Sequence, residues 1–164
     1  MAVALDSAPY PPALRGWLDA HARLQRDAEA LYNAVINLDP ADRLGATQLA
    51  GSFGTTARMV RAHHRFEDNV LFPTAAERDP AFASDVMVLS LGHVDIDDVV
   101  EDMSRTLAVL AGGTTRSLEV WQRLVHNAKT LRELLVEQIA VEEARALPVL
   151  VRTFTTARRP SAVA

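Results

Sequence analysis

The sequence of 164 residues contains no cysteine, which excludes disulfides and thiolate metal sites. No apolar run approaches the roughly 20 residues that a membrane span requires, and the first residues lack the basic end and long apolar stretch of a signal peptide. The formal net charge is −4 and no basic stripe occurs, which argues against nucleic acid as a partner. We therefore expect a cytoplasmic protein that binds neither membranes nor nucleic acid. Any metal must be held by imidazole, carboxylate, or other oxygen and nitrogen ligands.

Aromatic residues are also scarce, whereas alanine, leucine and other residues that favour helices dominate. No segment alternates with period two for long, so no sheet is expected. Turn signals occur at Asp39-Pro40, at Asp79-Pro80 and in AGGTT. The helical apolar periodicity fills the segments between them, at about 12–38, 44–72, 82–110 and 116–153. We predict one all-α domain over 1–164, an antiparallel up-down-up-down four-helix bundle at about 12–154 with a frayed tail at 155–164.

Two pairs of segments within the chain resemble each other. HHRFEDNVLFP (63–73) and QIAVEEARALP (138–148) both place a glutamate six residues before a proline, with a ligand-capable residue four positions before that glutamate. His21 and His93 each precede an aliphatic residue by three positions, which places both histidines on the packed face of a helix. The chain therefore resembles two related helical hairpins. In each, the first helix offers a histidine and the second offers two residues on one face.

The spacing of these residues from the turns indicates that they lie at one level of the bundle. In antiparallel neighbours, residues at one level are equally distant from the turn between them. The midpoint of His21 and His63 is residue 42, and that of His63 and His93 is residue 78. The midpoint of His93 and Gln138 falls just past GGTT. All three midpoints lie at predicted turns, so six residues should converge on one layer: His21, His63, Glu67, His93, Gln138 and Glu142.

A cluster of several polar groups in a core needs either a metal or a hydrogen-bond network that satisfies every group. We favour the metal. His64 lies about 100° around the helix from His63, so it is expected outside the ligand set or at the surface. His126 is expected at the surface. Asp97, in an acidic run that is mostly solvated, lies one turn after His93 and faces the same way, which makes it a further candidate ligand.

Histidines and carboxylates without thiolates suit iron, manganese or zinc. The chain contains neither the Glu-x-x-His of ferritin-type bundles nor His-Glu-x-x-His. Its segment HHRFEDNVLFP, with His21, LGHVDIDDV and VEEARALP, resembles the hemerythrin-like (HHE cation-binding) domains over about residues 15–150. The resemblance implies a four-helix bundle with a non-haem di-iron site that reacts with dioxygen, nitric oxide or peroxide. It also implies terminal ligands at His21, His63 and His93, and bridging carboxylates at Glu67 and Glu142.

Gln138 departs from the family pattern, which has histidine at this position. An amide oxygen is a weak neutral ligand for iron, so the half of the site near His93 should be impaired unless Asp97 compensates. Three outcomes remain open: an asymmetric di-metal centre, a mononuclear centre or a vestigial one. We favour the first. The expected cofactor is one or two non-haem iron ions, with manganese or zinc as alternatives.

The sequence thus predicts a protein that binds, senses or reacts with a small diatomic molecule or peroxide. The alternative from another class is a metal-free or weakly metallated helical interaction module whose metal site has decayed through Gln138. A third interpretation, a peroxide-decomposing enzyme, requires an open coordination position and turnover.

Overall fold

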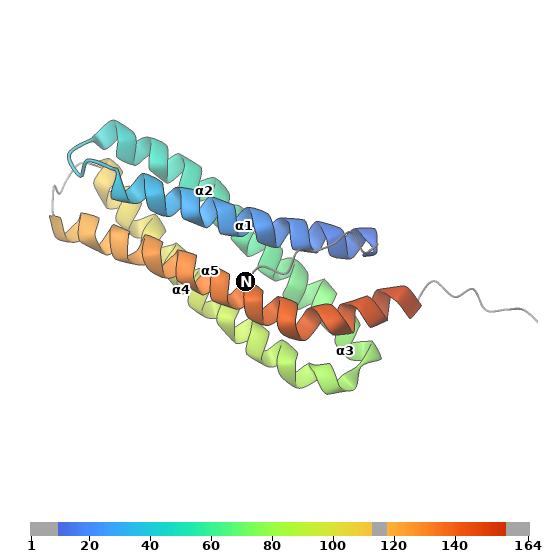
Figure 1. Ribbon diagram of the computed structural model, residues 1–164. Coiled ribbons are helices and arrows are strands. Elements are labelled where there is room, and N and C mark those ends of the chain that lie inside the picture. Colours follow the sequence, from blue (N-terminus) through green and yellow to red (C-terminus); the bar gives the residue numbers. More distant parts are fainter. Residues whose placement is uncertain (1–9, 113–117, 157–164) are drawn as a thin grey trace, which may run out of the picture.

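The computed structural model describes residues 10–112 and 118–156, and every regular element in these ranges is helical. The four long helices are α1 (Pro12–Ile36), α2 (Arg43–Phe66), α4 (Ala83–Gly112) and α5 (Leu118–Thr156). They lie alongside one another as a bundle (Figure 1). Helix α1 contacts α2 and α5, and α4 contacts the same two helices. The prediction of an all-α class built on four long helices is confirmed.

The helices begin where the sequence supplies their caps. Helix α1 starts at Pro12, directly after Pro11, and proline suits the first turn because the N–H that it lacks has no intrahelical partner there. Helix α2 is capped by Asp42, whose carboxylate accepts a hydrogen bond of 2.9 Å from the backbone N–H of Gly45. The turn between them is stabilised by Asp39, which accepts a hydrogen bond from the N–H of Ala41. The break predicted at Asp39-Pro40 therefore lies between α1 and α2.

The sequence predicted that the second periodic segment ends at Phe72, but in the structure the segment extends beyond this residue. It continues through a π-helical turn, Glu67–Leu71, into the short helix α3, Phe72–Arg78. In this turn the N–H of Phe72 donates to the carbonyl of Glu67, five residues earlier. Pro73 has no N–H, and its ring would clash with the carbonyl four residues earlier in a regular α-helix, so a wider turn beside it accommodates the proline. The chain reverses only at Asp79, before the 3-10 turn η2 (Pro80–Phe82).

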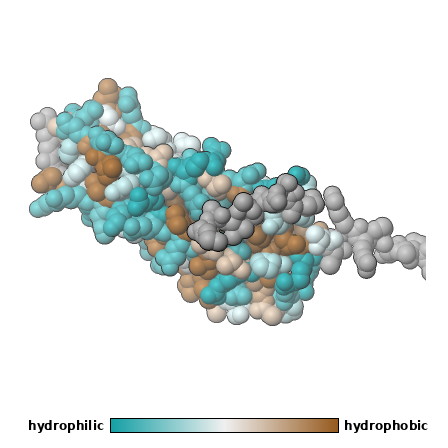
Figure 2. Space-filling model, in the orientation of Figure 1, coloured by the Kyte–Doolittle hydropathy of each residue, from teal (hydrophilic) through white to brown (hydrophobic). Residues whose placement is uncertain are grey.

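The last helix extends further than expected: α5 runs through Pro148 and ends at Thr156. The rest of the tail predicted to fray, 157–164, and the glycine-threonine turn at 113–117 lie outside the described residues. None of the described helices combines the length and apolarity needed to cross a membrane. Figure 2 shows hydrophilic residues over much of the visible face, with hydrophobic residues interspersed.

The apolar core is divided into two clusters, which we name the long and the short cluster. The long cluster includes Leu24, Phe53, Val60, Ile96 and Leu131. The short cluster includes Leu14, Phe72, Phe82, Leu89 and Leu150. Along each of the four chain segments that form the bundle, buried histidine or glutamate separates the residues of one cluster from those of the other. The fold therefore places a polar layer inside the bundle, with apolar packing on both sides.

Candidate metal centre

Five of the predicted site residues meet in this polar layer: His21 from α1, His63 from α2, Glu67 from the π-helical turn, His93 from α4 and Glu142 from α5. The two glutamates are almost completely buried, at 0% and 1% exposure. Burying two carboxylates so close together is costly unless cations or hydrogen-bond donors surround them. The structure thus brings together the residues that the turn midpoints placed at one level.

One half of the cluster contains two histidines. The Nε2 atom of His21 lies 3.4 Å from Oε1 of Glu67 and 3.3 Å from Oε2 of Glu142. The Nε2 atom of His63 lies 3.2 Å from the same Oε1 of Glu67. Each of these four residues offers a ligand atom, and the four atoms all lie within 4.8 Å of one another. This His₂Glu₂ group can hold a metal ion.

The other half of the cluster contains one histidine. The Nε2 atom of His93 lies 3.4 Å from Oε2 of Glu67 and 2.8 Å from Oε1 of Glu142. Each glutamate therefore directs one oxygen toward His21 and the other toward His93. Carboxylates in this arrangement can bridge two ions in a helical bundle.

The two remaining candidate ligands do not offer an oxygen to the cluster. The amide nitrogen of Gln138 donates to Oε1 of Glu142 at 2.7 Å, so this residue is a partner of a glutamate. Asp97 is 46% exposed, and its Oδ1 lies 3.8 Å from Nδ1 of His64. A separation of four residues rotates a side chain by about 40° around the helix, which is enough to direct Asp97 toward α2 while His93 points inward. The structure does not bring Asp97 to the two glutamates.

The contacts within the layer favour the ionised forms of Glu67 and Glu142 and the protonated forms of His21 and His93 when no metal is bound. Burial alone would lower the pKa of His21, but contacts with Glu142, Glu67 and Glu143 outweigh it and raise the pKa to about 9. Burial would raise the pKa of Glu67, yet the close contacts with the imidazoles of His21 and His63 leave it well below its usual range. The pKa of Glu142 is lowered in the same way, by His21 and His93. A bound cation would take over the role of these protons.

The donor set fits a metal ion. Nε2 of His63 and Oε2 of Glu67 are buried without a hydrogen-bond partner among the described residues. Buried polar atoms normally have a partner, so two unpartnered atoms in one cluster are consistent with a site for a metal ion. Imidazole nitrogen and carboxylate oxygen are ligands that suit iron, manganese and zinc.

Three residues outside the predicted ligand set support this cluster. Trp17 donates from Nε1 to Oε1 of Glu67 at 2.6 Å. Glu143 contacts Nδ1 of His21 at 3.0 Å, and Asp68 contacts Nδ1 of His93 at 3.1 Å. A signal for the two acids was present, because each directly follows a site glutamate in the two similar segments, as Glu-Asp and Glu-Glu. Each orients the histidine of a helix that packs against its own.

The other two histidines lie outside the glutamate contacts. His126 is exposed, as expected. His64 is buried rather than at the surface, and no contact joins it to either glutamate of the cluster among the described residues. Its Nδ1 is directed toward Asp97 and has no hydrogen-bond partner in the described part of the chain. Burial, followed by the charge of His93, lowers the pKa of His64 to about 4.

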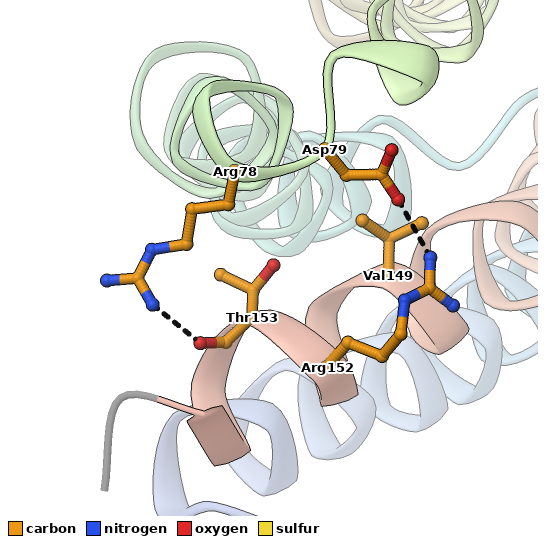
Figure 3. A pocket seen from close by; sticks show the side chains of 5 residues that line it. All are labelled: Arg78, Asp79, Val149, Arg152 and Thr153. Atoms are coloured by element: carbon orange, nitrogen blue, oxygen red, sulfur yellow. Dashed lines mark hydrogen bonds and ion pairs between the residues drawn. The ribbon is translucent and has the colours of Figure 1, made fainter. Parts of the chain in front are cut away.

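A separate hollow of about 220 Å³ lies where α3 meets the end of α5 (Figure 3). Its polar groups are paired with one another. Arg78 donates to the carbonyl of Thr153, and Arg152 donates to Asp79, both at 2.8 Å. No histidine lines this hollow, and it belongs to the apolar end of the bundle, so it is not part of the histidine-glutamate cluster.

Comparison with protein families gives one match. The family model described as the hemerythrin HHE cation binding domain matches residues 13–150. The match spans every residue of the histidine-glutamate cluster. Searches among curated proteins and among solved structures found no match.

Proposed function

Because this chain belongs to the hemerythrin HHE cation-binding domain family, we propose that it is a non-haem iron protein that binds, senses or reacts with a small oxidant such as dioxygen, nitric oxide or peroxide. One observation carries the proposal: the ligand atoms of His21, His63, Glu67 and Glu142 lie within 4.8 Å of one another in a buried layer. Iron bound there would supply an open coordination position and redox chemistry for such a ligand.

Four residues would bind the ion, and a fifth would orient one of them. His21 and His63 would bind the ion through Nε2, and Glu67 and Glu142 would each offer one oxygen. Glu143 accepts a hydrogen bond from Nδ1 of His21, which fixes the ring and directs Nε2 toward the ion. The two apolar clusters flank the layer on either side along the bundle.

We further propose that the long helices alternate in direction, up-down-up-down, within a single domain. Consecutive long helices contact each other, α1 with α2 and α4 with α5. The connections between them are short, and packed helices with short connections run antiparallel. This arrangement is what the turn midpoints require.

Metal analysis tests the proposed function directly. The protein would be produced in iron-supplemented medium, and its iron, manganese and zinc content would be measured together with an optical spectrum of the oxidised form. The proposal expects bound iron in the natural protein and little in the variant Glu67→Ala. A natural protein with no more metal than the variant would support the alternative, a metal-free helical interaction module. The hydrogen bond from Gln138 to Glu142 favours that alternative, because it satisfies a buried oxygen without a metal.

A further inference from the structure

The amide group of Gln138 lies against the backbone of Gly92, one residue before His93. A methyl group on Gly92 would lie 2.0 Å from Oε1 and 2.8 Å from Cδ of Gln138, which is closer than real Cβ atoms approach. Gly16, Gly51 and Gly112, in contrast, have open space around this position. Gly92 has no side chain, and the amide of Gln138 occupies the space that this leaves. We call this space the seat.

The surroundings of the amide decide which way it points. Its nitrogen donates to the carbonyl of Leu89 at 2.9 Å and to Oε1 of Glu142 at 2.7 Å. Both partners are acceptors only, so the reverse orientation would set the amide oxygen of Gln138 against two oxygens. Gln138 therefore meets the cluster with a hydrogen-bond donor. The oxygen, which alone could bind a cation, faces Gly92.

This donor occupies a lone pair of Glu142. The Oε1 atom accepts from Gln138 and also lies 2.8 Å from Nε2 of His93, so both of its lone pairs have a partner. The Oε2 atom faces His21, at 3.3 Å. Of the two glutamate oxygens that face His93, only Oε2 of Glu67 is left without a hydrogen-bond partner in the described ranges. One carboxylate oxygen and one imidazole make a poor cation site.

We propose that Gln138, seated on Gly92, is a positioning residue that reserves Glu142 for a single cation beside His21 and His63 and excludes a second cation from the side of His93. The inference rests on the proposed metal-binding function and specifies how many ions the site takes. It differs from the weak-ligand interpretation of Gln138, in which the amide oxygen would help to hold a second ion. The two interpretations predict opposite effects when the amide is removed.

Gln138→Ala distinguishes them. The metal-free protein and the variant would be titrated anaerobically with Fe²⁺, and separately with Co²⁺, by calorimetry. We expect the natural protein to bind one ion per chain. In the variant, Oε1 of Glu142 loses the hydrogen bond from Gln138. A second ion should then bind at least about tenfold more tightly than in the natural protein, which is the scale of one hydrogen bond to a charged group. The absorption of Co²⁺ reports its coordination number and would show the second ion as a distinct species.

Gly92→Ala tests the seat itself. The clash falls on the far end of a flexible side chain, so the amide can move away and the helix can keep its course. This variant should also bind a second ion more tightly. Because Gly92 acts through Gln138, the double variant Gly92→Ala/Gln138→Ala should bind like Gln138→Ala alone. Gly51→Ala is the matched control, because Gly51 also lies in a helix but has open space where the new methyl group would be. This variant should bind one ion. Circular dichroism of the metal-free variants checks that they fold.

Three results would overturn the inference. Two ions bound with similar affinity by the natural protein would do so while leaving the proposed function intact. A second ion that binds equally or more weakly in Gln138→Ala would show that the amide is a ligand or has no effect. The absence of any bound ion in every protein tested would overturn both the inference and the proposed function.

Discussion

The imidazole ring of His64 lies flat against that of His93, with the ring centroids 4.0 Å apart and the planes 7° apart. The two rings have different surroundings. His93 contacts both glutamates, and although burial acts to lower its pKa, Glu142 and Asp68 raise it to about 9. His64 faces Asp97 and keeps a low pKa. The stacked pair thus consists of His93, which belongs to the cluster, and His64, which only packs against it.

Replacing His64 should therefore leave metal binding nearly unchanged. His64→Ala removes a packed ring but no atom that faces the glutamates, so bound iron per chain should match that of the natural protein while the melting temperature falls. Asp97→Ala should likewise leave the metal content unchanged, because its carboxylate points toward α2. His63→Ala is the comparison and should lose most of the iron. Equal losses in His63→Ala and His64→Ala would mean that the ligand histidine is wrongly assigned.

Replacing Glu67 should abolish metal binding. Its Oε1 faces His21 and His63, and its Oε2 faces His93, so Glu67→Ala removes an oxygen from both halves of the cluster. We expect no stoichiometric iron after expression in supplemented medium, measured by elemental analysis. Glu133→Ala, which removes an exposed carboxylate from α5, is the control and should retain the natural content. Retention of iron by both variants would exclude Glu67 from the site.

The two acids behind the histidines should differ in importance. Glu143→Gln weakens the hydrogen bond that orients His21, and losses of this kind typically reduce metal affinity about 10–100-fold. Asp68→Asn makes the same change behind His93. If a single cation binds beside His21, calorimetric titration with Fe²⁺ should give a much larger loss for Glu143→Gln than for Asp68→Asn. Similar losses in both would indicate that both halves hold an ion.

The metal-free protein should lose stability as the pH rises above neutrality. The pKa values of His21 and His93 are raised from 6.5 to about 9 in the folded state. Their contribution to stability is therefore fully present below about pH 6.5 and is lost as the pH rises through 9. Melting temperatures measured in chelator at pH 6.5 and pH 9 should show this fall. The metal-loaded protein should show a smaller one, because metal ligands are deprotonated already. A flat profile for the metal-free protein would contradict the contacts described for His21 and His93.

Removal of the metal should lower the melting temperature at constant pH. An ion that binds only the folded chain stabilises it by about 2.7 kcal/mol at a free concentration 100 times the dissociation constant. Without it, the carboxylates of Glu67 and Glu142 are left close together and repel each other. Differential scanning calorimetry before and after chelation, with metal loss verified, measures the difference. An unchanged melting temperature would favour the metal-free interaction module.

The sequence predicted the cluster residues because their positions depend on regular geometry. Within a helix, a spacing of four residues places His63 and Glu67 on one face, and the distance of each histidine from a turn determines its level. The repeat between residues 63–73 and 138–148 added Glu142. None of these inferences needs the position of an individual atom.

The features that sequence analysis missed depend on contacts between helices. The direction of the Gln138 amide follows from Gly92 and the carbonyl of Leu89, which are on a different helix and more than 40 residues away in the chain. Asp97 is rotated by about 40° around α4 relative to His93. A spacing of four residues counts the two as one face of the helix, so the pattern could not separate them. The helix passes Pro73 because a π-helical turn precedes the proline, and spacing rules for α-helices contain no such turn.

The π-helical turn also changes the direction in which the residues after it face, relative to the buried residues before it. It contains one residue more than an α-helical turn, so the chain before it and the chain after it are offset by about 100° relative to an unbroken α-helix. The offset lets Glu67 face the histidines while Phe72, five positions later, is fully buried in the short cluster. The number of residues in Glu67–Leu71 is thus as important as their identity. Deleting any one of them would restore the ordinary count and turn either the ligand face or the apolar face away from the interior.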